Sequence, residues 1–590
     1  MRKKRIVGIG IIFLFGFLVL IGRLVQLQLI DTESYSTHNI NLIASSIEQR
    51  TQSYVLNEGR GILLDRNGIP MTSSIPSLIL FPFLKEREWP IDKVASILQD
   101  SPEEIEKAFE GEKKPFTYKQ GLSIEAMEKI NQLSIPGVYA VFKAGEEEEI
   151  GSHIIGSVRP NPHLIKATYP EKWNEGLVNK DTKLGISGLQ RAFDPFLISE
   201  GDTKLLFHAD RMGNPLLGLD VKLFSTTDSF YPLQVKTTVD LDIQKMLERA
   251  IDEAGITNGG AVLVDIKTNN LIGMVSRPMF EREDPLGNGA VNQMLKGYFP
   301  GSVFKTVILA AAYEKGISNE RMFDCNQNLY REGPGDRQLG KLNVKDSFAA
   351  SCNATFTELA EELIKQDSMI IEKTAEKLGI SETVGWNDSL YHYENFKQFP
   401  EESDPVFFKD DKDKQIKKAV DQTAIGQLNV KLSPLAIANM MATIGRGGEA
   451  KQVRTVTDIL YRNQTTFLSF NEKKIGSNPL SSDVVKLLQD SLREVVLSGT
   501  GRSYLKDLPV AGKSGTAELG EKVPYDHQWF AGYFPFQSPK YALVVVDFER
   551  KDKQYRTYEA FAKIVRSLNE KQVKNEIKVK SSTNPLEMIE

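Results

Sequence analysis

The chain has 590 residues, which is too long for one hydrophobic core and predicts two or more domains. Hydrophobic residues make up 41% and charged residues 26%, as in globular proteins, and the net charge of -5 gives no electrostatic support for binding nucleic acid. The two cysteines are too few for disulfides to build the fold, and no spacing among the six histidines favours a metal site.

The N-terminus carries a basic cluster, MRKKR at residues 1–5, followed by an uncharged apolar run at residues 6–22. This run is just long enough to span a bilayer. The basic residues predict a cytoplasmic N-terminus with the remaining chain outside the cell membrane. A cleaved signal peptide is the alternative, but it requires a shorter apolar core and a small-residue cleavage site, whereas RLVQLQLIDTESY follows here. We therefore expect a retained membrane anchor.

Residues 23–58 are polar and compatible with a helical juxtamembrane stalk, and residues 59–232 form the predicted pedestal domain. Within the pedestal, RGILLDRNGIPM at residues 60–71 predicts a strand, an Asn-Gly turn and a second strand. The remainder mixes short strands with acidic helical stretches. No pattern in this region indicates catalysis.

A second domain is predicted at residues 233–569, followed by a polar tail at residues 570–590. It begins with an alternating strand that leads into an amphipathic helix ending at Gly255. A hairpin is predicted at residues 259–278, and the strands GKSGTAEL, WFAGYFPF and YALVVVDFE precede a helix from Glu559 to about Leu568. A sheet formed from both ends of a domain, with helices between, is an α+β arrangement.

Three short motifs contain the candidate catalytic residues. Ser302 and Lys305 lie at the start of an apolar helix that follows a Pro-Gly pair. Ser351 and Asn353 open the segment SCNATFTELAEELI, and KSGT at residues 513–516 lies on a glycine-rich strand. The pattern Ser-x-x-Lys alone recurs by chance in a chain of this length. By itself it is equally compatible with a helix N-terminus that carries a solvated lysine. The specific signal is therefore the order Ser-x-x-Lys, Ser-x-Asn, Lys-Ser/Thr-Gly.

With these motifs the sequence resembles the penicillin-binding proteins, and in particular the class B transpeptidases. The resemblance covers nearly the whole chain, including RGILLDRNG, GISGLQRAFDPFL, TTVDLDIQ, AIGQLNVKLSPLAIANMMATIGRGG, GTG and HQWFAGYFP. It implies an α+β transpeptidase domain of the penicillin-binding and serine β-lactamase type, with an antiparallel sheet flanked by helices. This domain would stand on an elongated dimerisation or pedestal domain with one N-terminal transmembrane helix.

The residue types suggest how the motifs act together. A serine hydroxyl needs an adjacent base to become a nucleophile, and residues i and i+3 share a helix face, which places Lys305 Nζ near Ser302 Oγ. Burial and a second cation, Lys513, would lower the pKa of Lys305 and make it a usable base. The positive end of the helix would favour a developing oxyanion.

Further roles follow from the resemblance alone. It implies that the backbone N–H groups of Ser302 and Thr516 bind the oxyanion, that Ser351 relays a proton to the leaving amine, and that Asn353 hydrogen-bonds the substrate peptide. The terminal carboxylate of the substrate would bind Lys513, Ser514 and Thr516. Gly515 would keep this strand clear for close backbone approach.

Several residues near the motifs have simpler interpretations. Asn353 alone could be a helix cap, but its two partner motifs favour a site role. Cys352 lies between two site residues, yet no histidine is near it in sequence, so we expect it to face the core as a small apolar residue. His527 and Trp529 are equally compatible with the wall of a site and with packing.

Two segments depart from the family pattern. The segment usually written Gly-Gln-Gly is GQL here, with Leu428 in the last position. NGAVNQ at residues 288–293 lacks the arginine that often follows its second asparagine. Both lie outside the three motifs, so they affect the predicted edge of the cleft rather than the predicted activity.

The leading hypothesis is a peptidoglycan D,D-transpeptidase that cross-links D-Ala-D-Ala stem peptides through a serine acyl-enzyme, binds β-lactams covalently and needs no cofactor. No segment resembles a glycosyltransferase, so a membrane-embedded glycan polymerase is the expected partner. A D,D-carboxypeptidase or β-lactamase shares the motifs, but the chain length and the pedestal argue against both. A catalytically idle β-lactam sensor or scaffold is the third hypothesis, and the intact motifs argue against it.

Overall fold

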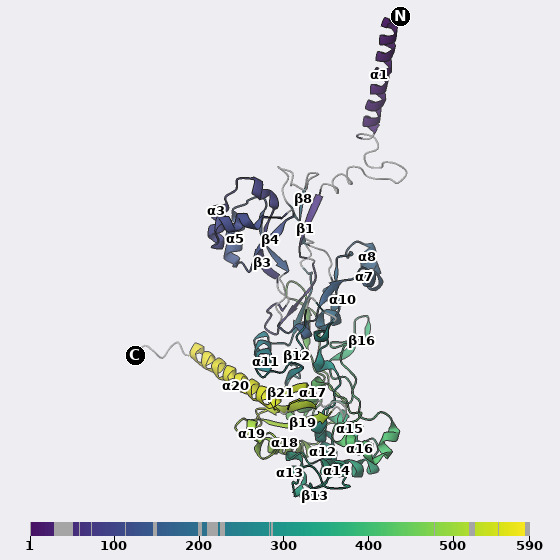
Figure 1. Ribbon diagram of the computed structural model, residues 1–590, viewed down its shortest axis with the longest axis vertical. Helices are drawn as coiled ribbons and strands as arrows, with labels where there is room; N and C mark the ends of the chain where they lie inside the picture. Colours follow the sequence, from purple (N-terminus) through teal and green to yellow (C-terminus); the bar gives the residue numbers. More distant parts are fainter. Residues whose placement is uncertain are drawn as a thin grey trace, which may run out of the picture. The chain divides into compact units, whose positions relative to one another are not determined.

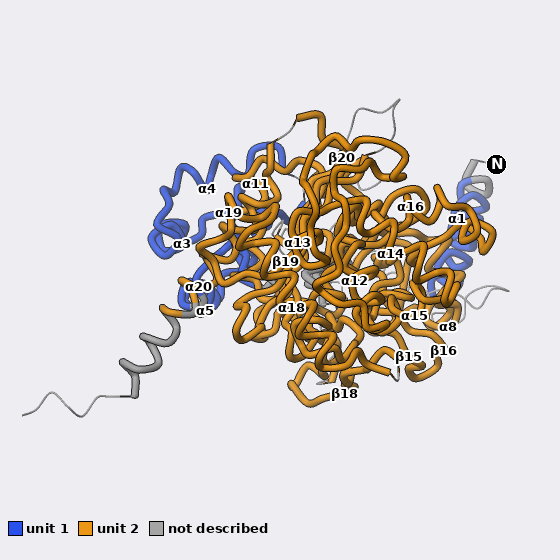
Figure 2. Tube along the Cα trace, turned by 90° about the horizontal axis from the view of Figure 1, so that it is seen from below, with its two compact units in different colours: residues 1–59, 73–146, 199–228 blue, residues 60–72, 147–198, 229–590 orange. Residues whose placement is uncertain are grey.

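The computed structural model describes residues 2–26, 28, 51–57, 59–71, 74–112, 114–144, 150–198, 203–208, 222–224, 230–281, 284, 287–476, 478–518, 526–552 and 554–583. The chain divides into two compact units, which are coloured separately in Figure 2. The first unit comprises residues 1–59, 73–146 and 199–228, and the second comprises residues 60–72, 147–198 and 229–590. Two segments that the sequence analysis assigned to the pedestal, residues 60–72 and 147–198, therefore pack within the second unit.

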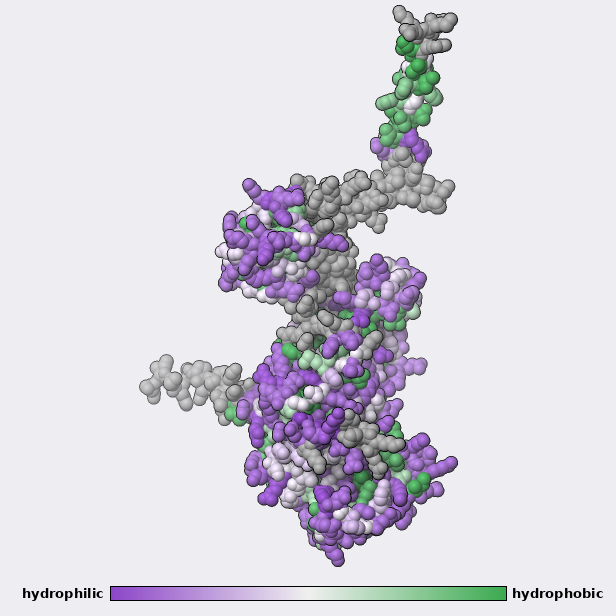
Figure 3. Space-filling view, in the orientation of Figure 1, coloured by the Kyte–Doolittle hydropathy of each residue, from purple (hydrophilic) through white to green (hydrophobic). Residues whose placement is uncertain are grey.

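The apolar N-terminal run of the first unit forms helix α1 (Arg2–Val25). Figure 3 shows apolar residues along this helix. Among the described residues, α1 is the one helix that is long and apolar enough to cross a membrane, over Ile6–Val25. The predicted apolar segment at residues 6–22 thus lies inside a longer helix.

The first unit also contains a three-stranded antiparallel sheet with a small core. Strand β3 (Ser74–Leu80) lies between β4 (Phe116–Gln120) and β5 (Val138–Ala144). Its buried Leu78 and Leu80 pack with apolar residues of three helices, α3 (Ile91–Leu98), α4 (Pro102–Ala108) and α5 (Ile124–Gln132). The predicted mixture of short strands and acidic helices is confirmed here.

A second sheet of the first unit corrects the predicted stalk. Strand β1 (Thr51–Asn57) pairs with β8 (Thr203–His208), which pairs with β9 (Lys222–Phe224). The helix-compatible stalk predicted across residues 23–58 is therefore wrong for β1. Its Thr, Tyr and Val residues favour a strand once a partner strand is available. Residues 29–50 lie outside the described residues.

The second unit is organised around a five-stranded antiparallel sheet (Figure 1). The strand order is β12 (Leu271–Arg277), β11 (Gly259–Asp265), β21 (Tyr541–Arg550), β20 (Asp526–Phe534) and β19 (Ala511–Glu518). The predicted hairpin at residues 259–278 and the three predicted C-terminal strands are confirmed. The two ends of the domain therefore meet in one sheet, where β11 pairs with β21.

Both faces of this sheet are buried. On β21, Val544 and Val546 belong to one apolar cluster, whereas Leu543 and Val545 belong to another. The side chains of a strand alternate between faces, so each cluster covers one face. The first face packs against α17 (Pro434–Gly445), and the second packs against α11 (Leu241–Glu253) and α20 (Arg556–Thr583).

A group of helices extends the first face and surrounds the buried helix α12 (Lys305–Glu314). Helix α12 packs against α14 (Asn353–Gln366), α15 (Ile370–Lys377) and α18 (Ser482–Leu497). Around these, α13 (Val344–Ala349) packs against α18, and α16 (Lys417–Ala424) packs against α14. Nine residues of α12 are buried, from Lys305 to Tyr313. A helix buried on all sides is a rigid base for the residues at its N-terminal end.

A four-stranded sheet in the second unit explains why residues 60–72 pack there. Its order is β18 (Thr466–Ser469), β17 (Val456–Leu460), β10 (Gln234–Thr237) and β2 (Ile62–Leu64), and β2 pairs in parallel with β10. The predicted turn follows β2, but the predicted second strand is reduced to a single bridge between Leu64 and Pro70. Arg60 forms an ion pair with the buried Asp194 at 2.8 Å.

The remaining elements are short. They are α6 (Ser152–Ile155), α7 (Pro162–Thr168), α8 (Pro170–Asn174), α9 (Gly188–Ala192), α10 (Asp194–Leu197), α19 (Arg502–Leu505), β6 (Val158–Pro160), β7 (Lys183–Gly185), β13 (Met322–Asp324), β14 (Lys341–Asn343), β15 (Asn387–Leu390), β16 (Tyr393–Lys397), and the 3-10 turns η2 (Pro82–Glu86), η3 (Asn288–Ala290), η4 (Gln293–Leu295), η5 (Gly301–Phe304) and η6 (Asp411–Gln415).

The C-terminal helix is longer than predicted. The sequence predicts a helix from Glu559 to about Leu568 and a polar tail from residue 570, whereas α20 extends from Arg556 to Thr583. The predicted tail is rich in Glu and Lys, which propagate a helix that packing has already started. Residues 584–590 lie outside the described residues.

Candidate active site

Ser302 lies in a tight turn rather than in a regular α-helix. It belongs to the 3-10 turn η5, and α12 begins at Lys305. Gly301 has a φ of +55°, and a Cβ atom on it would lie 2.4 Å from Thr516 O. Only glycine fits this position because β19 approaches so closely. The expectation that Ser302 shares the first turn of an α-helix with Lys305 is thus corrected, since Ser302 precedes that helix.

Lys305 is completely buried, with 0% of its surface exposed. Its Nζ donates to Asn353 Oδ1 at 2.7 Å, to Ser351 O at 3.0 Å and to Ser351 Oγ at 3.2 Å. The ammonium group also lies 5.6 Å from the centre of the Phe356 ring. Within the described residues no hydrogen bond joins Lys305 Nζ to Ser302 Oγ. The lysine instead contacts the second motif, which lies about 50 residues further along the chain.

Ser351 occupies the connection between α13 and α14 with a φ of +58°. A non-glycine residue in this left-handed region is unfavourable and persists only where its surroundings hold it. Its Oγ accepts one hydrogen bond from Lys305 Nζ at 3.2 Å and another from Lys513 Nζ at 3.1 Å. One hydroxyl group therefore links the two lysines. Asn353 begins α14 and has an exposed side chain.

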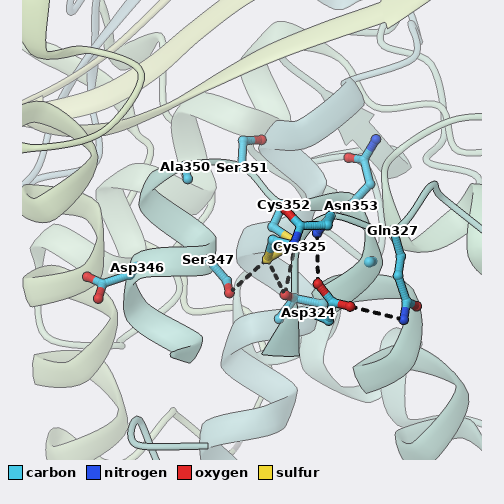
Figure 4. The surroundings of a disulfide bond; sticks show 12 residues. Asp324, Cys325, Gln327, Asp346, Ser347, Ala350, Ser351, Cys352 and Asn353 are labelled. Atoms are coloured by element: carbon cyan, nitrogen blue, oxygen red, sulfur yellow. Dashed lines mark hydrogen bonds between the residues drawn. A yellow bond between two sulfur atoms is a disulfide. The ribbon is translucent and has the colours of Figure 1, made fainter. Parts of the chain in front are cut away.

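Cys352, between Ser351 and Asn353, forms a disulfide with Cys325, with a Cα–Cα distance of 5.8 Å. Figure 4 shows this bond beside the two site residues. The prediction that Cys352 faces the core is confirmed, because both cysteines are 97% buried in a small apolar cluster. The sequence left their redox state open, and the structure shows the disulfide. Disulfide formation requires proximity in space, which two cysteines 27 residues apart do not reveal in the sequence.

The third motif lies on β19, the edge strand of the central sheet. Lys513 is fully buried, and its Nζ donates to Ser514 O at 3.0 Å as well as to Ser351 Oγ. Ser514 Oγ shares a hydrogen bond of 2.7 Å with Thr500 Oγ1, and Thr516 is exposed. A Cβ atom on Gly515 would lie 2.5 Å from Pro300 O. The backbone that approaches Gly515 closely is therefore that of Pro300, next to the turn that carries Ser302.

The electrostatics of the site are dominated by cations. Burial lowers the pKa of Lys305 well below its ordinary value, and the nearby charges of Lys513 and Arg337 lower it further. Burial also lowers the pKa of Lys513 to about 7, with an additional contribution from Arg337. Among the described residues, no carboxylate contributes to either shift. A lysine in this environment loses its proton far more easily than one in water.

The motifs border a cleft of about 1190 Å³. All the predicted site residues line it except the two lysines, which lie buried behind Ser351: the lining includes Ser302, Ser351, Asn353, Ser514, Gly515 and Thr516. The cleft also exposes side chains that the motifs did not indicate, including Tyr330, Arg337, Thr500, Tyr504, Tyr555 and Tyr558. Among these, only Thr500 lay in a segment that the family resemblance had marked.

The residues with two open interpretations are now placed. His527 is buried, burial lowers its pKa to about 4, and its Nδ1 accepts a hydrogen bond from Glu549 N at 3.2 Å. It therefore packs as a neutral ring. Trp529 is 1% exposed and contributes to the lining of the cleft, so it belongs to both the core and the wall.

The two departures from the family pattern differ in position. Leu428 has a φ of +61°, is 47% exposed and lines the cleft. Among the described lining residues, none comes from residues 288–293, where Asn292 is buried instead. Within the described part of the chain, no group of three or more His, Cys, Asp or Glu residues could hold a metal ion.

Comparison with known proteins identifies relatives that cover most of the chain. Stage V sporulation protein D of Bacillus subtilis (strain 168) is 25% identical over 92% of this chain and 81% of its own length. Peptidoglycan D,D-transpeptidase FtsI of Escherichia coli (strain K12) is 23% identical over 90% of this chain and 85% of its own length. Peptidoglycan D,D-transpeptidase PbpA of Mycobacterium tuberculosis (strain ATCC 25618 / H37Rv) is 23% identical over 61% of this chain and 74% of its own length.

A solved structure shares the fold. It comes from a study of how polymerization and crosslinking are coordinated by a peptidoglycan synthase complex, and the match has a TM-score of 0.63 at 21% identity. The match covers 95% of this chain and 97% of that chain.

Family models account for both halves of the sequence. The model of the penicillin-binding protein dimerisation domain matches residues 56–218, and the model of the penicillin binding protein transpeptidase domain matches residues 259–570. The second match alone covers more than half of the chain and contains all three motifs. The chain therefore belongs to the penicillin-binding protein transpeptidases, with the dimerisation domain and transpeptidase domain of the class B type.

Proposed function

We propose that the protein is a peptidoglycan D,D-transpeptidase that works through an acyl-enzyme on Ser302. The observation that carries this proposal is the geometry around Ser351, whose Oγ is hydrogen-bonded to both buried lysines behind the cleft that Ser302 lines. Buried lysines with lowered pKa values, in contact with a hydroxyl group, supply a base and a proton relay in one site.

In the first step, Ser302 Oγ attacks the carbonyl carbon between the two D-alanines of a donor stem peptide, and neutral Lys305 takes the hydroxyl proton. The proton then passes from Lys305 through Ser351 Oγ to the nitrogen of the departing D-Ala. The hydrogen bonds from both lysines to Ser351 support this route. The contact between Lys305 and Ser302 would form when substrate binds, as catalytic contacts often do.

The carbonyl oxygen of the donor becomes an oxyanion, which the backbone N–H groups of Ser302 and Thr516 would stabilise. The close packing of the Gly301 turn against Thr516 supports this pairing, because it holds the two backbone segments together. The terminal carboxylate would bind at Lys513, Ser514 and Thr516. Asn353 Oδ1 already accepts from Lys305, which leaves Nδ2 to donate to the donor peptide.

In the second step, the amine of a neighbouring stem attacks the acyl-enzyme and completes the cross-link. We place the catalytic unit outside the cell membrane, with α1 as a single anchor and the basic residues 1–5 in the cytoplasm. The fold match to a chain of a peptidoglycan synthase complex supports a membrane-embedded glycan polymerase as the partner.

Covalent labelling of the purified protein by penicillin tests the proposal. Ser302→Ala should abolish labelling while leaving thermal unfolding unchanged, because the substitution removes one half-buried hydroxyl group. Ser498→Ala is a matched control, since Ser498 is exposed and outside the cleft lining. Full labelling of Ser302→Ala would refute the assignment. Given a donor and an acceptor peptide, the wild type should form a cross-linked product, whereas hydrolysis alone would indicate a carboxypeptidase.

A further inference from the structure

The loop at residues 326–340 is fastened to the turn that holds Ser351. At its base, Cys325 N donates to Gly340 O at 2.9 Å, and Asn326 Oδ1 accepts from Gly340 N at 2.8 Å. The disulfide then joins Cys325 to Cys352, the residue after Ser351. The loop is thus tied covalently to the second catalytic motif, and its position relative to Ser351 is set by that bond.

Arg337 is held at the cleft end of this loop. Its Nη1 donates to Ala350 O at 3.1 Å and its Nη2 donates to Ser351 O at 3.0 Å. The residue is exposed and lines the cleft. A guanidinium group has five N–H donors, so these two hydrogen bonds leave others available. Within the described residues Arg337 has no carboxylate within the 4.0 Å of an ion pair.

The position of Arg337 leaves a positive charge uncompensated inside a substrate cleft. Its charge acts on both Lys305 and Lys513, and neither lysine has a carboxylate partner among the residues that the structure describes. A structural arginine is normally neutralised by an acidic side chain, as Arg331 of the same loop is by Glu361 of α14. An exposed, anchored and unpaired arginine is therefore prepared for an anionic ligand, and a carboxylate is the planar group that it binds best.

We propose that Arg337 is a specificity-determining residue that binds a second, non-terminal carboxylate of the stem peptide. The inference rests on the proposed transpeptidase function. In the proposed function the terminal carboxylate binds at β19, whose Lys513 contacts Ser351 Oγ, whereas Arg337 lies on the loop that the disulfide attaches and contacts Ser351 O. The cleft would therefore prefer stems whose diamino acid carries a free carboxylate over stems in which that group is an amide.

The test compares matched peptides with the full chain. Donor and acceptor stems are each prepared with the diamino-acid carboxylate free or amidated, and kcat/KM for cross-linking is measured for every combination. Wild type should favour the acidic peptide by roughly 10- to 100-fold, the range of a charge-assisted hydrogen bond. If amidation of the donor stem lowers kcat/KM, Arg337 binds the donor. If amidation of the acceptor stem lowers it, Arg337 binds the acceptor.

Variants separate binding from a merely structural role. Arg337→Gln should bring the ratio of acidic to amidated kcat/KM close to one, and Arg337→Lys should retain part of it because the charge remains. Arg337→Gln also removes a charge that lowers the lysine pKa values, but that effect slows both peptides equally and leaves the ratio unchanged. Lys341→Gln, an exposed residue outside the cleft lining, controls for the loss of one charge and should match the wild type.

The outcomes distinguish this inference from the proposed function. A wild-type protein that is labelled by penicillin but treats acidic and amidated stems alike would overturn the role of Arg337 and leave the transpeptidase proposal standing. An Arg337→Gln variant that keeps the wild-type ratio of acidic to amidated kcat/KM would likewise overturn the role of Arg337 and leave the transpeptidase proposal standing. A wild-type protein that takes up no penicillin label would overturn the proposed function itself.

Discussion

Two regions of the second unit bury lysines with opposite consequences. In the cleft, Lys305 and Lys513 are 0% exposed, and burial among cations lowers the pKa of both. Beside α15, the Lys414 side chain is 6% exposed, but its Nζ lies 2.6 Å from Glu372 Oε1 and 2.9 Å from Asp411 Oδ1. Burial alone would lower the pKa of Lys414, yet the two carboxylates outweigh it and raise the pKa.

The difference shows that burial lowers the pKa of a lysine only where no nearby carboxylate opposes the shift. Glu402 shows the corresponding effect for an acidic group, because burial shifts its pKa in the opposite direction from that of the cleft lysines. Burial raises its pKa to about 7, and hydrogen bonds from Val384 N and Gly385 N oppose this shift without cancelling it. In both cases the opposing interactions are too weak to offset burial, so the group tends toward its neutral form.

The largest expected effect comes from replacing Lys305 by a group that cannot lose its proton. Lys305→Arg should reduce the second-order rate of β-lactam acylation by about 10²- to 10⁴-fold, because general-base catalysis is lost while the positive charge remains. Lys414→Arg is the matched control. It keeps its carboxylate partners and lies outside the cleft lining, so it should acylate like the wild type.

The pH dependence sharpens this test. Wild-type acylation should rise with pH as Lys305 loses its proton, and because its pKa is lowered, the rise should begin well below the range of an ordinary lysine. Lys305→Arg should lack this rising limb. A Lys305→Arg rate within tenfold of the wild type would contradict the base role and reduce Lys305 to a structural cation like Lys414.

A smaller effect is expected when the disulfide beside the cleft is removed. The double substitution Cys325→Ala and Cys352→Ala should lower the free energy of unfolding by about 2–4 kcal/mol, because a cross-link between residues 27 apart no longer restricts the unfolded chain. Denaturant unfolding measures this loss, and the reduced wild type should show a similar one. Acylation should fall less than in Lys305→Arg, since Ser302 and both lysines remain. A loss of acylation as large as that of Lys305→Arg would contradict this ranking.

The smallest effect concerns Glu402 and the pH dependence of stability. Its pKa is about 7 in the folded protein and 4.5 in the unfolded reference, so its contribution is fully present below about pH 4.5 and is lost as pH rises through about 7. Glu402→Gln should therefore gain about 1–2 kcal/mol relative to the wild type between these pH values. Parallel denaturation curves at pH 4.5 and 8 measure the gain. A constant difference would show that Glu402 stays charged through its hydrogen bonds.

Local sequence patterns were sufficient where the structure depends on neighbours in the chain. The hairpin of β11 and β12 follows from two apolar strands around Asn269, whose φ of +55° suits asparagine. The C-terminal strands follow from their continuous apolar runs, and the three motifs follow from their order. The prediction of a second strand after Asp65 and the predicted end of α20 were wrong. Partner strands and packing determine where such elements end, and neither can be seen in the local sequence.

The sequence by itself therefore determined the family, the α+β domain and the residues from which a site is made. Only the tertiary structure decided that Lys305 turns toward Ser351 and Asn353, that Cys352 is bonded to Cys325, and that Arg337 reaches the cleft. Each of these contacts joins segments that are distant along the chain. Their formation depends on how helices and strands pack, and spacing within one segment carries no information about which distant segment will lie opposite it.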